Sequence, residues 1–179
     1  MISIQVSSDS PHHLVQAKEL SSVLGYPLVT DIGSPDNYQN DPSYVLLVGE
    51  DGLSLFPSNR RLHGPIRVDF MFGSNNHRRR FGGGNGQAIA KAVGVSGRFL
   101  PRVLDLTAGL GGDGFVLASL GCRVSLVERH PLICSLLRDG INRAREEGES
   151  DPAIRDLMNR LDLIECDSLE ILSDITIDQ

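Results

Sequence analysis

The feature that most constrains the fold is the run of residues 103–114, where an apolar segment ends at an acid and four glycines follow. The segment 103–106 predicts a short strand, and a helix is predicted from about Asp113 to Leu120. Glycines between a strand and a helix allow a tight turn and the close approach of a ligand to the main chain. The free N–H groups at the start of such a helix suit a carboxylate or a phosphate. Because glycine turns also have purely structural uses, this run alone does not define a site.

Strands and helices continue to alternate after this run. Further strands are predicted at 122–127 and 161–165. Helices are predicted from 131 to about 147, from Asp151-Pro152 to about 160, and at 169–172. This alternation implies right-handed crossovers and a parallel sheet. The predicted fold class is α/β: a Rossmann-like sheet behind a small N-terminal α/β domain.

The first hundred residues predict that small mixed unit. Ser10 is expected to cap a helix that Pro11 opens and that Gly25 ends. The remaining expectations are strands at 2–6, 44–48, 53–56 and 67–72, a hairpin turn at 50–52, a loop at 31–42, and a helix at 87–93 ended by Gly94. We divide the chain into an N-terminal domain (1–66), a basic glycine-rich linker with a helix (67–100), and a Rossmann-like domain (101–179).

Acids stand at the ends of all three strands of the predicted parallel sheet. Asp105 ends the first, Glu128 ends the second about twenty residues after the glycine loop, and Asp167-Ser168 follows the third. A carboxylate in the position of Glu128 can accept both hydroxyls of a ribose. Open α/β sheets bind ligands outside the carboxyl ends of their strands. A nucleoside site therefore explains these residues better than a chance row of surface acids.

The glycine loop bears on which nucleoside cofactor would bind. Gly109, Gly111 and Gly112 are followed by Asp113, a spacing that departs from the dinucleotide fingerprint. Asp113 would repel a pyrophosphate, whereas it could receive the ammonium of an amino-acid moiety. The whole pattern is typical of the methyltransferase form of the fold, which uses S-adenosylmethionine. A NAD-dependent oxidoreductase, with Glu128 on the adenosine ribose, remains the alternative enzyme.

The charge of the chain is unevenly distributed. The net charge is −6 overall, but residues 60–102 carry nine Lys or Arg against the single acid Asp69. Within this basic middle, His77, the arginines Arg78, Arg79 and Arg80, and Phe81 precede a run of three glycines. Such residues can hold phosphates and stack a base, which favours RNA binding. The alternative is a hinge whose arginines pair with acids of the neighbouring domain.

Other site classes find little support in the sequence. The three cysteines, Cys122, Cys134 and Cys166, form no pair with metal-ligand spacing, and two of them lie in apolar segments. The five histidines are scattered, so no metal site is expected. The sequence shows neither a membrane-spanning apolar run nor a secretory signal. We therefore expect a cytoplasmic protein without a membrane partner.

Several stretches together resemble the RsmJ (YhiQ) family of S-adenosylmethionine-dependent methyltransferases of small-subunit ribosomal RNA. The resemblance runs from about Arg67 to Asp174, and the first sixty residues match only loosely. It rests on Val68-Asp-Phe, His77-Arg-Arg-Arg-Phe-Gly-Gly-Gly, Ala90-Lys-Ala-Val-Gly, Asp105-Leu-Thr-Ala-Gly-Leu-Gly-Gly-Asp, Ala118-Ser-Leu-Gly-Cys-Arg-Val, Val127-Glu-Arg and Ser173-Asp-Ile-Thr.

The resemblance implies methylation of the exocyclic N2 of a guanosine near the 3′ end of 16S rRNA, with the rRNA or the small ribosomal subunit as partner. It implies cofactor contacts at Gly112, Asp113, Glu128, Arg129, Asp167 and Ser168. The match at Asp167 is looser, because the family also uses Ser there.

One departure concerns the end of the chain. The family continues past Ile175-Thr-Ile with a further strand and an Asp-Pro-Met-Phe-Pro motif that receives the target base. We expect this chain to be truncated before that motif, with a class I methyltransferase sheet that is incomplete and limited to its strands 1–3. Its catalytic residues are therefore unknown, and it would not methylate RNA by itself. A non-catalytic RNA-binding or ribosome-assembly module is the second alternative.

Overall fold

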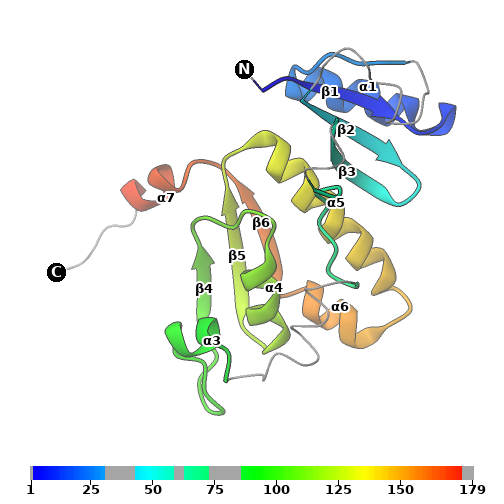
Figure 1. The fold of residues 1–179 in the computed structure, drawn as a ribbon. Helices are drawn as coiled ribbons and strands as arrows, with labels where there is room; N and C mark the ends of the chain where they lie inside the picture. Colours follow the sequence, from blue (N-terminus) through cyan, green and yellow to red (C-terminus); the bar gives the residue numbers. More distant parts are fainter. Residues whose placement is uncertain (1, 31–42, 59–62, 73–85, 175–179) are drawn as a thin grey trace. The chain divides into compact units, whose positions relative to one another are not determined.

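The computed structural model describes residues 2–30, 43–58, 63–72 and 86–174. The chain divides into two compact units, Met1–Arg67 and Val68–Gln179, each described by itself (Figure 1). The finer division, with 67–100 as a separate linker, stays a prediction. The predicted loop at 31–42 and the basic residues 77–81 lie outside the described residues.

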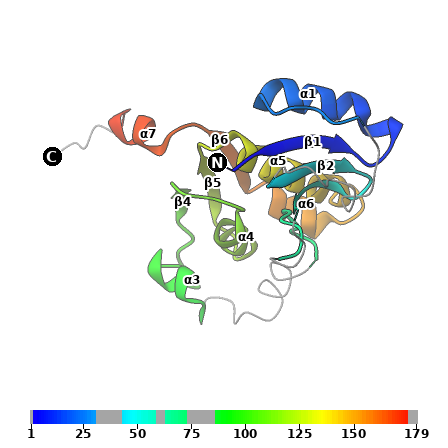
Figure 2. The same ribbon diagram turned by 45° about the horizontal axis from the view of Figure 1, so that its top comes forward.

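The first unit is a three-stranded sheet with one helix. Its strands lie in the order β1-β2-β3 (Figure 1). Strands β1 and β2 are parallel, with α1 beside them (Figure 2), and β2 and β3 form the predicted antiparallel hairpin. A helix joins the two parallel strands, as a right-handed crossover requires. Its elements are β1 (Ile4–Ser8), the 3₁₀ helix η1 (Pro11–His13), α1 (Leu14–Leu24), β2 (Tyr44–Gly49) and β3 (Gly52–Pro57).

The start of α1 differs from the prediction. The strand before it is shifted to Ile4–Ser8, and a 3₁₀ turn that begins at Pro11 precedes the α-helix. Ser10 is extended, but its hydroxyl bonds to Nδ1 of His13 at 3.1 Å and caps no backbone N–H. Ser10 thus lies at the predicted N-cap position, but its side chain does not act as a cap, because His13 is close enough to take its hydroxyl. Gly25 ends the helix at φ 69°, as expected.

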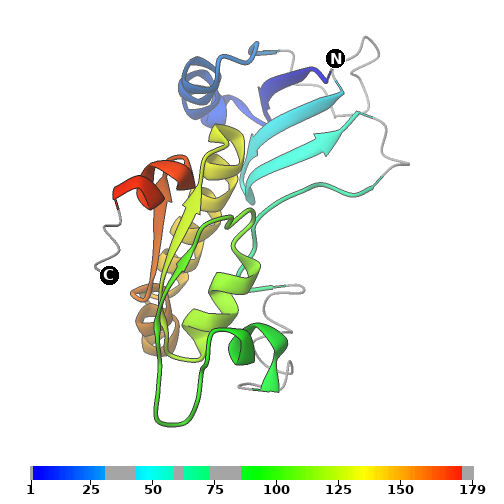
Figure 3. The same ribbon diagram turned by 90° about the vertical axis from the view of Figure 1, so that its left-hand side faces the viewer.

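The second unit contains the predicted parallel sheet, in the order β4-β5-β6 (Figure 3). Within the described residues, β4 is therefore an edge strand. The observed bounds agree with the predicted ones to within a few residues, and β6 agrees exactly at both ends. Its elements are α3 (Ala88–Ala92), β4 (Arg102–Asp105), α4 (Gly112–Ser119), β5 (Arg123–Glu128), α5 (Pro131–Glu147), α6 (Pro152–Met158), β6 (Leu161–Glu165) and α7 (Ser168–Asp174).

Helices α4 and α5 pack on one face of this sheet. A Cβ placed on Gly114 of α4 would collide with the side chain of Leu126 on β5, so glycine permits close helix–strand packing there. A Cβ on Gly111, at the start of α4, would lie 2.8 Å from Leu137 of α5 and 3.4 Å from the same Leu126. The strand residues Leu104 and Ile164 are 39% and 37% exposed. The apolar core of this unit thus lies between the sheet and these two helices.

The predicted strand at 67–72 is not formed. Val68 and Phe70 are buried, as a strand would require, but the polar groups around them have other partners. The carboxylate of Asp69 accepts the N–H groups of Met71 and Phe72, and the carbonyl of Val68 accepts a hydrogen bond from Arg143. Side chains therefore take backbone groups that a sheet would have used.

Candidate functional site

The carboxyl ends of β4, β5 and β6 meet at one edge of the second unit's sheet (Figure 3). Asp105 is the last residue of β4 and Glu128 is the last of β5. Asp167 and Ser168 follow β6, and Ser168 begins α7. The parallel topology thus brings together residues that are separated by more than sixty positions in the sequence.

The loop between β4 and α4 depends on glycines at two positions. Gly109 has φ 54° and Gly111 has φ 73°, a backbone region that other residues rarely adopt. Gly111 is also the N-cap of α4, and its own N–H donates to the carbonyl of Ala108 at 2.8 Å. Gly112 and Asp113 are the first residues of the helix, and Asp113 is exposed. The loop therefore ends at the start of a helix, where the helix dipole is positive.

Glu128 ties the strand end to this loop. One carboxylate oxygen, Oε2, accepts the N–H of Gly109 at 3.0 Å. The other, Oε1, accepts the N–H groups of Arg129 and His130 at 2.9 and 2.8 Å. A carboxylate offers about four acceptor positions, so Oε2 keeps one for a further donor. Glu128 can thus orient the loop and still accept a hydroxyl hydrogen bond from a ligand.

Asp167, which follows the next strand, is fixed in a similar way. Its Oδ1 accepts the N–H of Leu169 at 3.0 Å, and its Oδ2 accepts from the guanidinium of Arg129 at 3.1 Å. The backbone N–H of Leu169 and the Arg129 guanidinium hold the pKa of Asp167 below its usual value. The side chain therefore remains an ionised acceptor beside Glu128 at neutral pH.

Two hollows lie at this sheet edge, and the loop residues Leu106 and Thr107 line both. The smaller hollow, about 290 Å³, contains four predicted cofactor residues. These are Glu128, Arg129, Asp167 and Ser168.

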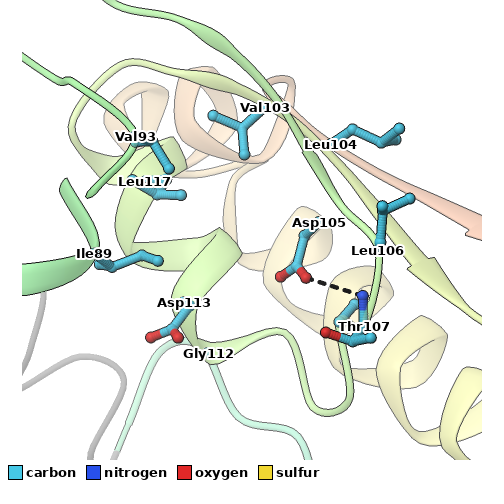
Figure 4. A pocket seen from close by; sticks show the side chains of 11 residues that line it. Ile89, Val93, Val103, Leu104, Asp105, Leu106, Thr107, Gly112, Asp113 and Leu117 are labelled. Carbon is cyan, nitrogen blue, oxygen red and sulfur yellow. Dashed lines mark hydrogen bonds between the residues drawn. The ribbon is translucent and has the colours of Figure 1, made fainter. Parts of the chain in front are cut away.

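The larger hollow, about 590 Å³, is polar at one end and apolar at the other (Figure 4). Asp105, Gly112 and Asp113 line it, and Oδ1 of Asp105 accepts the N–H of Thr107 at 3.2 Å. The apolar end is formed by Ile89, Val93, Val103, Leu104 and Leu117.

Sequence reasoning did not identify the apolar wall. Ile89 and Val93 come from α3 and the residue that follows it, a segment assigned to the linker rather than to the site. Their spacing of four residues on a predicted helix was the available signal, because it places both on one face. The three-dimensional path of the chain was needed to bring that face to β4.

The cysteines are placed as expected for buried thiols. Cys122 and Cys134 are buried, and burial raises the pKa of both. The thiol of Cys134 donates to the carbonyl of Glu128 at 3.2 Å and so helps to fix the end of β5. In the described part of the chain, no group of three His, Cys, Asp or Glu residues could hold a metal ion. No helix among the described residues has the length and apolar character needed to cross a membrane.

The nine predicted cofactor residues thus lie in three groups along one edge. Four line the smaller hollow, three line the larger one, and Gly109 and Gly111 shape the loop between them. Acids that accept hydrogen bonds, a helix start and an apolar wall together suit an elongated ligand with a nucleoside at one end and a charged group at the other. A parallel sheet with this glycine loop and these strand-end acids defines a Rossmann-like protein of the methyltransferase type.

The comparison with protein families identifies the particular family. Residues 34–179 match the family model described as "Putative SAM-dependent methyltransferase", so the chain belongs to that family. Its fold resembles the crystal structure of a SAM-dependent methyltransferase from Neisseria gonorrhoeae, with a TM-score of 0.68 and 31% identity. That likeness covers 96% of this chain and 63% of the other.

Curated relatives carry a more specific name. The chain is 47% identical over 156 residues to the ribosomal RNA small subunit methyltransferase J of Pseudomonas aeruginosa strain LESB58, covering 87% of this chain and 55% of the relative. It is 46% identical over 150 residues to the enzyme of the same name from Ectopseudomonas mendocina, covering 84% and 54%. The chain therefore spans about half the length of these curated relatives.

Proposed function

We propose that this protein takes part in S-adenosylmethionine-dependent methylation of small-subunit ribosomal RNA. The observation that carries the proposal is the convergence of Glu128, Asp167 and the glycine loop at one sheet edge in a chain of the SAM-dependent methyltransferase family. The name of the Pseudomonas relatives supports rRNA as the substrate class.

The residues at this edge fit the chemical groups of S-adenosylmethionine. The spare acceptor position on Glu128 would receive a ribose hydroxyl, with Arg129, Asp167 and Ser168 completing that hollow. Asp113 and Asp105 would face the ammonium of the methionine part, and the N–H of Gly112 would face its carboxylate. The cofactor supplies a methyl group already activated by its sulfonium. The contribution of the protein is then alignment of that methyl group with the acceptor.

The cofactor assignment is tested by calorimetric titration of the chain with S-adenosylhomocysteine. Glu128→Gln removes the charge of the carboxylate but keeps its size, and we expect binding to weaken about 10- to 100-fold, the range for losing a charged hydrogen bond. Glu165→Gln is a matched control, because Glu165 is paired in register with Glu128 but contacts Arg138 instead. Unchanged affinity in the Glu128 variant, or competition by NAD, would contradict the assignment.

RNA contact is assigned to the basic middle of the chain. The predicted contact residues, His77, Arg78, Arg79, Arg80 and Phe81, lie outside the described residues. In the described part of the same region, Lys91, Arg98 and Arg102 are exposed, and Asp69 is the single acid in residues 60–102. This local excess of positive charge supports electrostatic binding of a phosphate backbone.

The RNA assignment predicts a change in salt dependence. Replacing Arg78, Arg79 and Arg80 by alanine should reduce the slope of log K against log salt by about 2 to 3, since each phosphate contact contributes about 0.7 to 0.9. Fluorescence anisotropy with a labelled fragment of small-subunit rRNA measures this slope. The exposed Arg155 of α6 serves as the control, and Arg155→Ala should leave the slope unchanged. An equal effect of both variants would argue against a local RNA site.

The finer specificity, the exocyclic N2 of a guanosine in 16S rRNA, is part of the same proposal. Nucleoside analysis of small-subunit rRNA from cells with and without the gene provides the test. We expect one N2-methylguanosine to disappear when the gene is absent. Loss of a different methylated nucleoside would contradict the specificity for guanosine N2 but would still support an rRNA methyltransferase.

A further inference from the structure

The segment 68–72, here named the strap, crosses the second unit without joining its sheet. Two of its side chains, Val68 and Phe70, are each 1% exposed. The carbonyl of Val68 accepts a hydrogen bond from Arg143 of α5, and Nε of Arg143 donates to Asp139 one turn earlier at 2.9 Å. The strap is therefore anchored to a well-packed helix.

The surface of α5 is shaped for this crossing. A Cβ added at Gly140 would collide with the side chain of Val68 and would lie 3.0 Å from the Val68 carbonyl oxygen. Both neighbours are hard to move, because valine is stiff at χ1 and the carbonyl belongs to the backbone. Glycine at this position thus allows the strap to lie directly on the helix.

The other buried side chain of the strap lies beneath the glycine loop. The ring of Phe70 stacks on that of Phe115 in α4, with centroids 4.7 Å apart and planes inclined by 20°. The tip of the same ring lies 3.2 Å from the position that a Cβ on Gly111 would occupy. Gly111 is the left-handed N-cap of α4, so Phe70 supports the residue at which the loop turns into the helix.

The loop is consequently held at two places. Glu128 binds the N–H of Gly109 on one part of the loop, and the aromatic ring packs against Gly111 two residues later. The next residues, Gly112 and Asp113, line the larger hollow. Any shift of Gly111 would therefore move the first N–H groups of α4 relative to a bound ligand.

From these contacts we infer that Phe70 is a positioning residue for the cofactor site, acting through Gly111. The inference rests on the proposed cofactor binding at this edge. It assigns a role to the Val68-Asp-Phe motif, which lies about forty residues upstream of the loop and reaches it where Phe70 packs against Gly111. A rigid ring suits this role because it has few rotamers and a large buried surface.

The test compares two mild core substitutions. Phe70→Leu keeps an apolar side chain beneath the loop, and Leu161→Val alters a fully buried residue at the start of β6, the opposite end of the strand from the site. Both variants should remain folded by circular dichroism and lose a similar amount of thermal stability. Calorimetry with S-adenosylhomocysteine should show binding about five- to tenfold weaker for Phe70→Leu and unchanged for Leu161→Val, since small misplacements of a binding loop are costly.

Hydrogen exchange provides a readout that does not need the cofactor. The N–H of Gly111 is bonded to the carbonyl of Ala108, and its exchange should be several-fold faster in Phe70→Leu than in Leu161→Val. Equal exchange and equal affinity in the two variants would overturn the inference. If the unmodified chain does not bind the cofactor, the proposed function fails, and the exchange rates alone decide whether Phe70 positions the loop.

Discussion

The two units share a strand–helix–strand arrangement, yet their bridging helices are buried to very different extents. In the first unit, Ala17 is the one buried residue of α1, and Val15 and Val23 are 66% and 78% exposed. In the second unit, five consecutive residues of α4, 114–118, are buried. The same topology therefore produces one surface helix and one helix that is enclosed on several sides.

The loops that lead into these helices also differ, in whether their polar groups are left available for a ligand. In the first unit, Asp9 follows β1, and both of its carboxylate oxygens already have partners nearby. One binds Nδ1 of His13 at 2.6 Å, and the other accepts the N–H of Glu50 at 3.0 Å. In the second unit, two left-handed glycines open the loop, and Glu128 supports it from the neighbouring strand. A βαβ unit becomes a candidate ligand site when its loop keeps acceptor positions and helical N–H groups available, and this needs a helix that cannot shift.

The largest expected difference concerns the two helices themselves. Phe115→Ala should destabilise the second unit by about 3–5 kcal/mol, because it removes a 1% exposed ring from a stacked pair. Val23→Ala on α1 should change stability by less than about 0.5 kcal/mol, since the side chain is mostly exposed. Urea unfolding followed by circular dichroism measures both. Similar losses of unfolding free energy in the two variants would show that α1 is buried more deeply than the exposure of Val23 indicates.

A smaller difference is expected at the helix starts. Asp151 caps α6 by accepting the N–H groups of Ala153 and Ile154, so Asp151→Ala should cost about 1 kcal/mol. Ser10 bonds to a histidine instead of a backbone N–H, and Ser10→Ala should cost less than about 0.5 kcal/mol. Thermal unfolding of both variants checks the contrast. A loss at Ser10 as large as that at Asp151 would show that the hydroxyl does cap the helix.

The smallest expected effect is a pH dependence in the first unit. Burial by itself would raise the pKa of Asp9, but hydrogen bonds from His13 and from the N–H of Glu50 outweigh it and lower the pKa below 3.8. A lowered pKa in the folded state stabilises the unit above the unfolded value, and this contribution is lost as the pH falls through the folded pKa. Because Asp9 is partly exposed, the contribution should be below about 1 kcal/mol.

Comparison of the unmodified chain with Asp9→Asn between about pH 3 and pH 6 measures this contribution. The stability of Asp9→Asn should fall less on acidification than that of the unmodified chain. Asp51→Asn, which alters an exposed acid near the same turn, should show the same fall as the unmodified chain. Identical pH profiles for all three proteins would show that the lowered pKa of Asp9 does not cause the loss of stability on acidification.

Local sequence patterns determined most of the second unit. Strand β6 was predicted to the residue and helix α5 closely, because Pro131 opens the helix and the apolar residues Leu161, Leu163 and Ile164 mark the strand. The acids at the strand ends could be placed at one edge because parallel strands share a direction. Alternation and turn residues are local signals, so they can be read without knowledge of the packing.

Tertiary contacts decided what those patterns could not. The apolar run around Val68 and Phe70 predicts a strand, but Arg143 and Gly140 of α5, more than seventy residues later, hold it as a strap. Ile89 and Val93 form a wall of the larger hollow only because α3 packs against α4. The sequence alone determined which backbone conformations each segment favours and where acids and glycines fall. Which partner satisfies each buried carbonyl or covers each apolar face was decided by the folded chain, since these contacts join segments whose separation no local pattern encodes.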